Sequence, residues 1–250
     1  MKDSKQSELL QEHHPDEIRK RLKRPVKPQY ISDAVLGGID GCVTTFAVVS
    51  SVIGAGLPSS IALILGFANL ISDGFSMAVS NFESVKTDNE YIHSLRRTEE
   101  EHIDKVPEGE REEIRQIFQA KGFEGSTLEK IIETITQDRQ LWIQTMLTEE
   151  YGVNLTTVNP LKAALATIFT FICVGAIPLF PFFINTIEVQ QQFILSASFA
   201  AIMFFSIGAI KGLIYVKPIF SSGLSTLLTG SLATSLAFTA GYLLRNAFGI

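Results

Sequence analysis

The sequence predicts an all-α polytopic membrane protein with five transmembrane helices and a cytoplasmic helical insert between helices 2 and 3. Charged residues are scarce over long stretches: between Ala34 and Ser72 the one charged side chain is that of Asp40, and residues 160–250 carry five. Residues 83–151, by contrast, hold 17 of the 26 acidic residues. A helix of about 20 apolar residues is long enough to cross a bilayer, whereas so acidic a segment belongs in water.

The first two spans are expected to form a helical hairpin within residues 32–82. Residues 1–31 precede it as a charged leader, in which DEIRKRLKR predicts a short amphipathic helix that ends before two prolines. Span 1 is expected from Ser32, a suitable N-cap residue, to about Ala55. The turn GAGLPSS separates it from span 2, which occupies the rest of this range.

Residues 83–151 are expected to form a small helical domain in water. Span 2 continues as a helix up to a break at Pro107, and a second break is expected at Gly122. STLE, at residues 126–129, has the spacing of a capping box, and Asp138 is placed to cap a last helix. These signals predict a domain of short helices inserted between spans 2 and 3.

Residues 152–250 contain the remaining three spans, expected at about 161–179, 193–214 and 220–244. Lys211 and Lys217 flank the loop after span 4, whereas the loop after span 3 has no basic residue. By the positive-inside rule, the N-terminus and the acidic domain lie in the cytoplasm, and Arg245 is the one charge against this orientation. We therefore expect a multi-pass membrane protein.

Span 1 contains two acidic residues, Asp33 and Asp40, on one face, because seven residues make two helical turns. A charged side chain at the centre of a bilayer costs roughly 2.5–3.5 kcal/mol on insertion scales, so such residues usually have a function. If span 1 met its copy at a twofold axis, the paired Asp40 carboxylates would leave room for a cation. Small residues near this face favour close helix packing: Gly37, Gly38 and Gly41. Alternatively, Asp33 faces water at the helix start and a protonated Asp40 is hydrogen-bonded within the bundle.

Span 2 carries a polar stripe of Asn69, Asp73 and Met77, spaced four residues apart, with Glu83 near the same face. Carboxylate and amide oxygens are hard ligands and a thioether is a soft one. This combination suits a borderline transition metal better than magnesium or calcium. Alternatively, Met77 only fills space in the bundle, the commoner role of a single methionine in a span.

The acidic insert contains side chains with the spacing of a second metal site. Pairs three or four residues apart share a helix face: Glu99 with His102, Glu110 with Glu113, and Met146 with Glu150. Converging helices could combine them into an oxygen-rich site with one imidazole and one thioether. The alternative is a solvated acidic surface, which is what most charge runs are.

A di-iron oxidase is a weaker interpretation of the same segment. Glu-x-x-His, typical of ferritin-like sites, occurs as Glu90–His93 and Glu99–His102 on one helix. Nine residues correspond to about 900° of rotation, which puts the two motifs on opposite faces. The sequence has no phosphate-binding glycine loop, and its net charge of −5 gives no support to a nucleic-acid partner. We therefore expect neither enzyme activity nor a prosthetic group.

Residues 30–250 resemble the vacuolar iron transporter (VIT) family. The resemblance rests on three segments: DAVLGGIDGCVTTFAVV in span 1, GFANLISDGFSMAVSNFESVKT in span 2 and NPLKAALATIFTFICVGAIPLFPF in span 3. It implies a homodimer with five spans per subunit and a metal path between the subunits. It also implies export of ferrous iron (Fe2+) from the cytosol in exchange for protons, often with manganese (Mn2+) as a second substrate. The membrane it implies is the plasma membrane in a bacterium and the vacuolar membrane in a eukaryote.

The resemblance also implies roles for single residues. Transport-path roles fall on Asp33, Asp40 and Met77, while Asn69 stands where some members have a glutamate, and Asp73 lies one turn further on. Cytoplasmic metal-binding roles fall on Glu99, Glu110, Glu113, Met146 and Glu150. Two positions depart from the family pattern, since His102 stands in place of a glutamate and Leu147 in place of a second methionine.

These observations together predict a proton-coupled antiporter that exports Fe2+ and Mn2+. Metal ions, protons, the lipid bilayer and a second copy of the chain are its expected partners. The competing hypothesis is a membrane-anchored metal buffer or sensor that binds ions without moving them. Time-dependent metal flux would separate the two.

Overall fold

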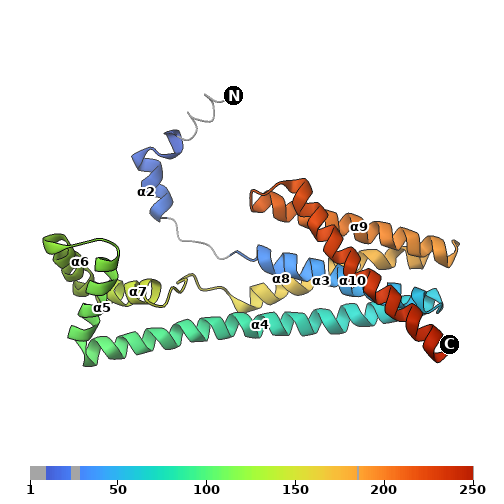
Figure 1. Cartoon of the computed structure of the whole chain (residues 1–250), viewed down its shortest axis with the longest axis horizontal. Coiled ribbons are helices and arrows are strands. Elements are labelled where there is room, and N and C mark those ends of the chain that lie inside the picture. Colours follow the sequence, from blue (N-terminus) through green and yellow to red (C-terminus); the bar gives the residue numbers. More distant parts are fainter. Residues whose placement is uncertain (1–9, 24–28, 185, 250) are drawn as a thin grey trace. The chain divides into compact units, whose positions relative to one another are not determined.

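A computed structural model describes residues 10–23, 29–184 and 186–249, and over these ranges the regular structure is entirely helical (Figure 1). The chain divides into two compact units. One unit comprises Tyr30–Glu110 and Val158–Ile250, and the other comprises Met1–Gln29 and Arg111–Thr157. The all-α prediction is therefore confirmed for the described residues.

The larger unit contains five helices that are long and apolar enough to cross a membrane. They are α3 (Ile31–Gly54), α4 (Ser59–Lys105), α8 (Pro160–Gly175) continued by the 3₁₀ helix η1 (Ile177–Phe183), α9 (Val189–Ile214) and α10 (Ile219–Phe248). The five predicted spans are thus present. Helix α4 has 47 residues, so it is about 70 Å long, more than twice the thickness of a hydrocarbon core.

Span 3 differs in detail from the prediction, because its α-helix ends at Gly175 and a 3₁₀ helix continues it. Pro178 and Pro181 lie in this 3₁₀ segment, and proline has no N–H group to continue an α-helical ladder. The start of α8 is capped by Asn159, whose side chain accepts a hydrogen bond from the Lys162 N–H at 3.1 Å.

Two predicted N-caps are wrong. Helix α3 begins at Ile31, one residue before Ser32, because the Ala34 N–H already bonds to the Tyr30 carbonyl oxygen at 3.1 Å. Helix α6 begins at Gly125, before Ser126, because the Leu128 N–H already bonds to the Glu124 carbonyl oxygen at 3.4 Å. The hydroxyl of Ser126 therefore lies inside the first turn, where it is not in the N-cap position.

The smaller unit contains short helices, the second of which begins in the larger unit. Helix α2 (Pro15–Lys23) covers most of the predicted amphipathic segment, and the two prolines after it lie outside the described residues. Helix α5 (Pro107–Ala120) begins at the predicted break, and α6 (Gly125–Gln137) and α7 (Arg139–Glu149) follow. Asp138 caps α7 as predicted, since its carboxylate accepts from the N–H groups of Gln140 and Leu141 at 2.9 and 3.2 Å.

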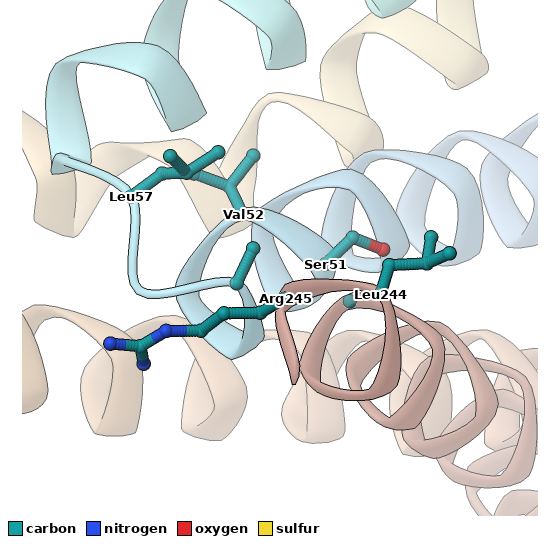
Figure 2. Close-up of a pocket in the computed structure, with 7 residues that line it drawn as sticks. Ser51, Val52, Leu57, Leu244 and Arg245 are labelled. Atoms are coloured by element: carbon teal, nitrogen blue, oxygen red, sulfur yellow. The ribbon is translucent and has the colours of Figure 1, made fainter. Parts of the chain in front are cut away.

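A tight turn joins α3 to α4 and completes the predicted hairpin. Gly56 in this turn has a φ of +70°, and a Cβ built on it would lie 2.6 Å from Arg245 Nη1. Figure 2 shows the Arg245 side chain extending from α10 alongside this turn. The positive φ favours glycine at this position, because residues with a Cβ rarely adopt it.

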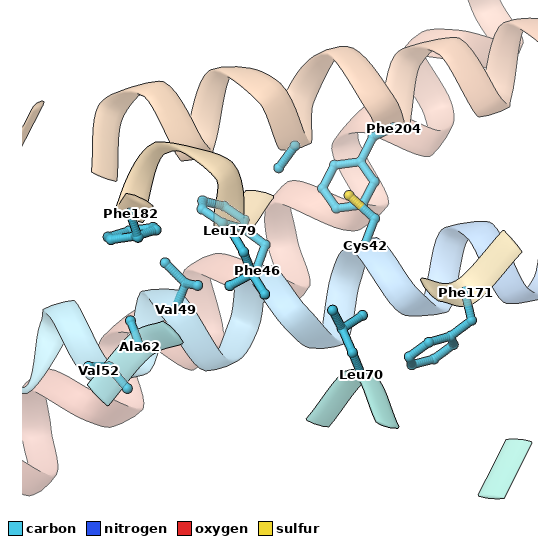
Figure 3. Packing of buried hydrophobic residues seen from close by; sticks show 11 residues of the cluster. Cys42, Phe46, Val49, Val52, Ala62, Leu70, Phe171, Leu179, Phe182 and Phe204 are labelled. Atoms are coloured by element: carbon cyan, nitrogen blue, oxygen red, sulfur yellow. The ribbon is translucent and has the colours of Figure 1, made fainter. Parts of the chain in front are cut away.

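The membrane helices pack around a cluster of buried apolar side chains (Figure 3). Cys42, Phe46 and Val49 of α3 lie in it with Phe171 of α8 and Phe204 of α9. Glycines bring the backbones into contact beside this cluster. A Cβ on Gly41 would lie 2.4 Å from the Phe171 carbonyl oxygen. Small residues therefore provide close packing, as expected where lipid offers no hydrophobic driving force between helices.

The span 1 glycines consequently face helices of the same chain. A Cβ on Gly37 would lie 2.2 Å from the Thr167 carbonyl oxygen of α8, and Gly38 lies against Val174 and Ile207. These glycines are therefore used within the subunit and do not form a free surface for a second copy of α3.

Gly208→Ala tests this packing without touching the polar residues of α3 and α4. A Cβ on Gly208 would lie 2.5 Å from the Ser222 carbonyl oxygen, so we expect a loss of about 1–3 kcal/mol of unfolding free energy. Thermal unfolding in detergent measures it. Gly109→Ala is the control, because its Cβ would meet Val106 only at 4.0 Å. Equal stability of the two variants would contradict the close packing of α9 and α10.

Candidate functional site

Asp40 of α3 and Asp73 of α4 lie close enough for their charges to interact. Both side chains are half-buried, and both helices are apolar enough to span a membrane. Two like charges in a medium of low dielectric constant repel each other, and a cation beside them would relieve that repulsion. The pair is therefore suited to hold a positive ion.

Asn69 of the polar stripe joins the same two helices. Its Nδ2 donates to Thr44 Oγ1 at 3.2 Å, and the Thr44 hydroxyl donates to the Asp40 carbonyl oxygen at 2.9 Å. Met77 is half-buried and packs against the apolar cluster. This placement is compatible both with a packing role for Met77 and with a role of its thioether as a metal ligand.

Asp33 lies near the start of α3, within a second polar group. Asn81 of α4 donates to Asp33 Oδ1 at 2.9 Å and to Thr167 Oγ1 of α8 at 2.8 Å. Glu83, by contrast, is exposed, and its Oε2 lies 3.8 Å from Lys86 Nζ. The structure thus gives Asp33 two neighbours that sequence reasoning missed, Asn81 and Thr167.

The missed residues differ in how well the sequence signalled them. Asn81 follows Met77 by four residues and so continues the spacing of the stripe, and Thr44 follows Asp40 by four. Both could have been found from helical periodicity. Nothing local distinguishes Thr167, since its role depends on α8 packing against α3.

Three residues of the predicted acidic site gather where α4 ends and α5 begins. His102 Nδ1 lies 3.2 Å from Glu110 Oε1 and 4.0 Å from Glu99 Oε1. The Glu99 and Glu110 side chains are only 1% and 2% exposed, whereas that of His102 is 47% exposed. Buried carboxylates are retained only where they are paired or bind a cation, because isolated burial of a charge is costly. A solvated acidic surface therefore does not describe Glu99 and Glu110.

The other three residues lie in the smaller unit. Met146 is fully buried within it, while Glu113 and Glu150 are exposed. Within the described ranges, no group of three or more His, Cys, Asp or Glu side chains has the arrangement of a metal site. The six-residue metal cluster stays a prediction.

A cavity of about 250 Å³ opens beside the α3–α4 turn (Figure 2). Seven described residues line it: Ser51, Val52, Ala55, Leu57, Gly241, Leu244 and Arg245. Its walls are almost entirely apolar and include no carboxylate, so it is not suited to hold a metal cation.

The family model described as the VIT family matches residues 31–242. The chain belongs to the VIT family. The vacuolar iron transporter of Toxoplasma gondii is 27% identical over 229 residues, which cover 88% of this chain and 76% of that protein. Vacuolar iron transporter 1 of Oryza sativa subsp. japonica is 26% identical over 228 residues (90% and 87%), and the vacuolar iron transporter of Centaurea cyanus is 30% identical over 217 residues (83% and 85%).

The match places all the acidic residues of the proposed path and of the acidic segment within the VIT family region. It begins at the first residue of α3 and ends within α10, so it includes all five apolar helices and the acidic segment. This VIT family member is a multi-pass membrane protein.

Proposed function

We propose that this VIT family member transports Fe2+ across a membrane, with Mn2+ as a second substrate. Relatives over most of its length carry the name vacuolar iron transporter, which supports iron as the substrate and transport rather than catalysis. The observation that carries the proposal is the juxtaposition of Asp40 and Asp73 on two apolar helices. A structural role would not require two acidic side chains in so apolar a setting.

The proposed path follows the polar residues of α3 and α4: Asp33, Asp40, Asn69, Asp73, Met77 and Glu83. Oxygen ligands with one thioether suit a borderline divalent ion. Asp40, Asp73 and Met77 are half-buried, so part of each side chain remains accessible in the single subunit.

A second copy of the chain is proposed to cover the accessible part of these side chains. The exposed residues next to the stripe on α4, Ser72 and Ser76, are small and would let a partner helix approach closely. In a homodimer such a helix would enclose the half-buried carboxylates between two subunits.

Proton coupling follows from the chemistry of the ligands. Carboxylates must be deprotonated to bind a metal ion, so metal binding releases protons. Asp40 and Asp73 can therefore carry either ion but not both at once, which is the requirement for antiport. With the N-terminus and acidic segment in the cytoplasm, as the positive-inside rule predicts, the direction of metal transport is export from the cytosol.

The acidic segment is proposed to capture cytosolic ions before transport. Its proposed ligands are Glu99, His102, Glu110, Glu113, Met146 and Glu150. The first three already lie together, and two of them are buried carboxylates that a cation would neutralise.

Asp40→Asn in proteoliposomes loaded with a metal-sensitive dye tests the path. We expect the initial rate of Fe2+ uptake to fall more than about tenfold, because the neutral amide removes a stabilisation of at least roughly 1.4 kcal/mol for the passing ion. Asp88→Asn is the control, since Asp88 is an exposed carboxylate elsewhere on α4. Wild-type uptake by Asp40→Asn would contradict the path. Metal binding by the wild type without accumulation over time would instead favour a buffer or sensor.

A pH-sensitive dye in the same vesicles tests the coupling. Because each ion taken up displaces protons from the carboxylates, we expect the vesicle interior to become more alkaline as Fe2+ enters. The change should disappear in protein-free vesicles. An unchanged internal pH during uptake would rule out proton exchange and leave iron transport intact.

Glu110→Gln tests the capture of ions by the acidic segment. Loss of this buried carboxylate is expected to weaken Mn2+ binding to the detergent-solubilised protein by at least about tenfold, as metal ligands and the residues that orient them commonly do. Equilibrium dialysis with Mn2+ measures it. Glu108→Gln, an exposed acid in the same turn of α5, should bind Mn2+ like the wild type. Equal binding by both variants would contradict the proposed site.

A further inference from the structure

Three membrane helices meet in one hydrogen-bonded group formed by Asp33, Asn81 and Thr167. Asn81 Nδ2 lies 2.9 Å from Asp33 Oδ1 and 2.8 Å from Thr167 Oγ1. The Thr167 hydroxyl lies in turn 3.1 Å from the Ala163 carbonyl oxygen and 3.4 Å from that of Asp33. Thr167 is fully buried, while Asp33 and Asn81 are half-buried. One amide group therefore connects α4 to both α3 and α8.

Asp33 and Thr167 are held at a fixed separation, because α3 and α8 touch along their backbones. A Cβ on Gly37 would lie 2.2 Å from the Thr167 carbonyl oxygen, and one on Gly175 would lie 2.6 Å from the Gly41 carbonyl oxygen. Contacts this close leave little room for one helix to rotate against the other. Asn81 thus attaches α4 to a rigid pair of helices at the level of Asp33.

We propose that Asn81 is a positioning residue of the transport path, whose amide holds one oxygen of Asp33 and leaves the other for the passing cation. This inference rests on the proposed function, because it assumes that Asp33 meets the transported ion. A carboxylate held in one orientation binds a cation with less loss of conformational entropy than a freely rotating one.

Asn81→Leu removes the amide and keeps a side chain of similar size. In the flux assay we expect the half-saturating Fe2+ concentration to rise roughly tenfold, the lower end of the effect seen for residues that orient metal ligands. Asn89→Leu is the matched control, because Asn89 of α4 donates to the Val158 carbonyl oxygen at 2.8 Å and contacts no carboxylate in that bond. It should lower the unfolding temperature by a similar amount and leave half-saturation unchanged. Asn81→Gln keeps an amide and should show a smaller rise than Asn81→Leu.

Equal half-saturation in Asn81→Leu and Asn89→Leu would overturn the inference and leave Asn81 as a structural contact. If Asn81→Leu gives no folded protein, Asn81→Ala, which also lacks the amide, decides, and a wild-type half-saturation in that variant overturns the inference as well. Asp33→Asn separates this result from the proposed function. Wild-type kinetics in Asp33→Asn would remove Asp33 from the path, whereas impairment of Asp33→Asn alone would preserve the path and reject the role of Asn81.

Discussion

A carboxylate surrounded by apolar helices must be neutralised, and this constraint explains how the polar side chains of the larger unit are arranged. Asp40 and Asp73 lie near each other on α3 and α4, in helices that otherwise carry few charges. Each alone would cost several kcal/mol in hydrocarbon. A proton or divalent cation bound by both carboxylates would offset that cost. In the proposed antiport, the two ions alternate at this pair of side chains.

Such a pair needs a scaffold that holds its helices in register. Glycines supply it, because Gly37 and Gly41 let α3 lie directly against the backbone of α8. Helix α4 is attached differently, through apolar contacts and through the amides of Asn69 and Asn81, which bond to side chains of α3 and α8. The hydrogen bonds that α4 makes through Asn69 and Asn81 thus lie beside the acidic residues of α3.

Helix α4 also joins the two candidate ion sites of the protein. It carries Asp73 within its apolar half and Glu99 with His102 near its end, and Glu110 of α5 completes the second group. The 26 positions from Asp73 to Glu99 correspond to about 39 Å along a continuous helix. An ion released from the acidic group would therefore have to travel a distance comparable to the thickness of the bilayer. The burial of Glu99 and Glu110 favours a defined ion site over diffuse attraction by an acidic surface.

The sequence alone determined the five apolar helices, the break at Pro107, the cap at Asp138 and the spacing of the polar stripe, because hydropathy, proline and helical periodicity are local properties. It did not determine which helix each face meets. The span 1 glycines proved to contact α8, Thr167 joined Asp33, and two N-caps lay one or more residues earlier than expected. Membrane helices are apolar on most sides, so periodicity does not specify their neighbours. That choice depends on side-chain and backbone contacts between segments far apart in the chain, which only the tertiary structure decides.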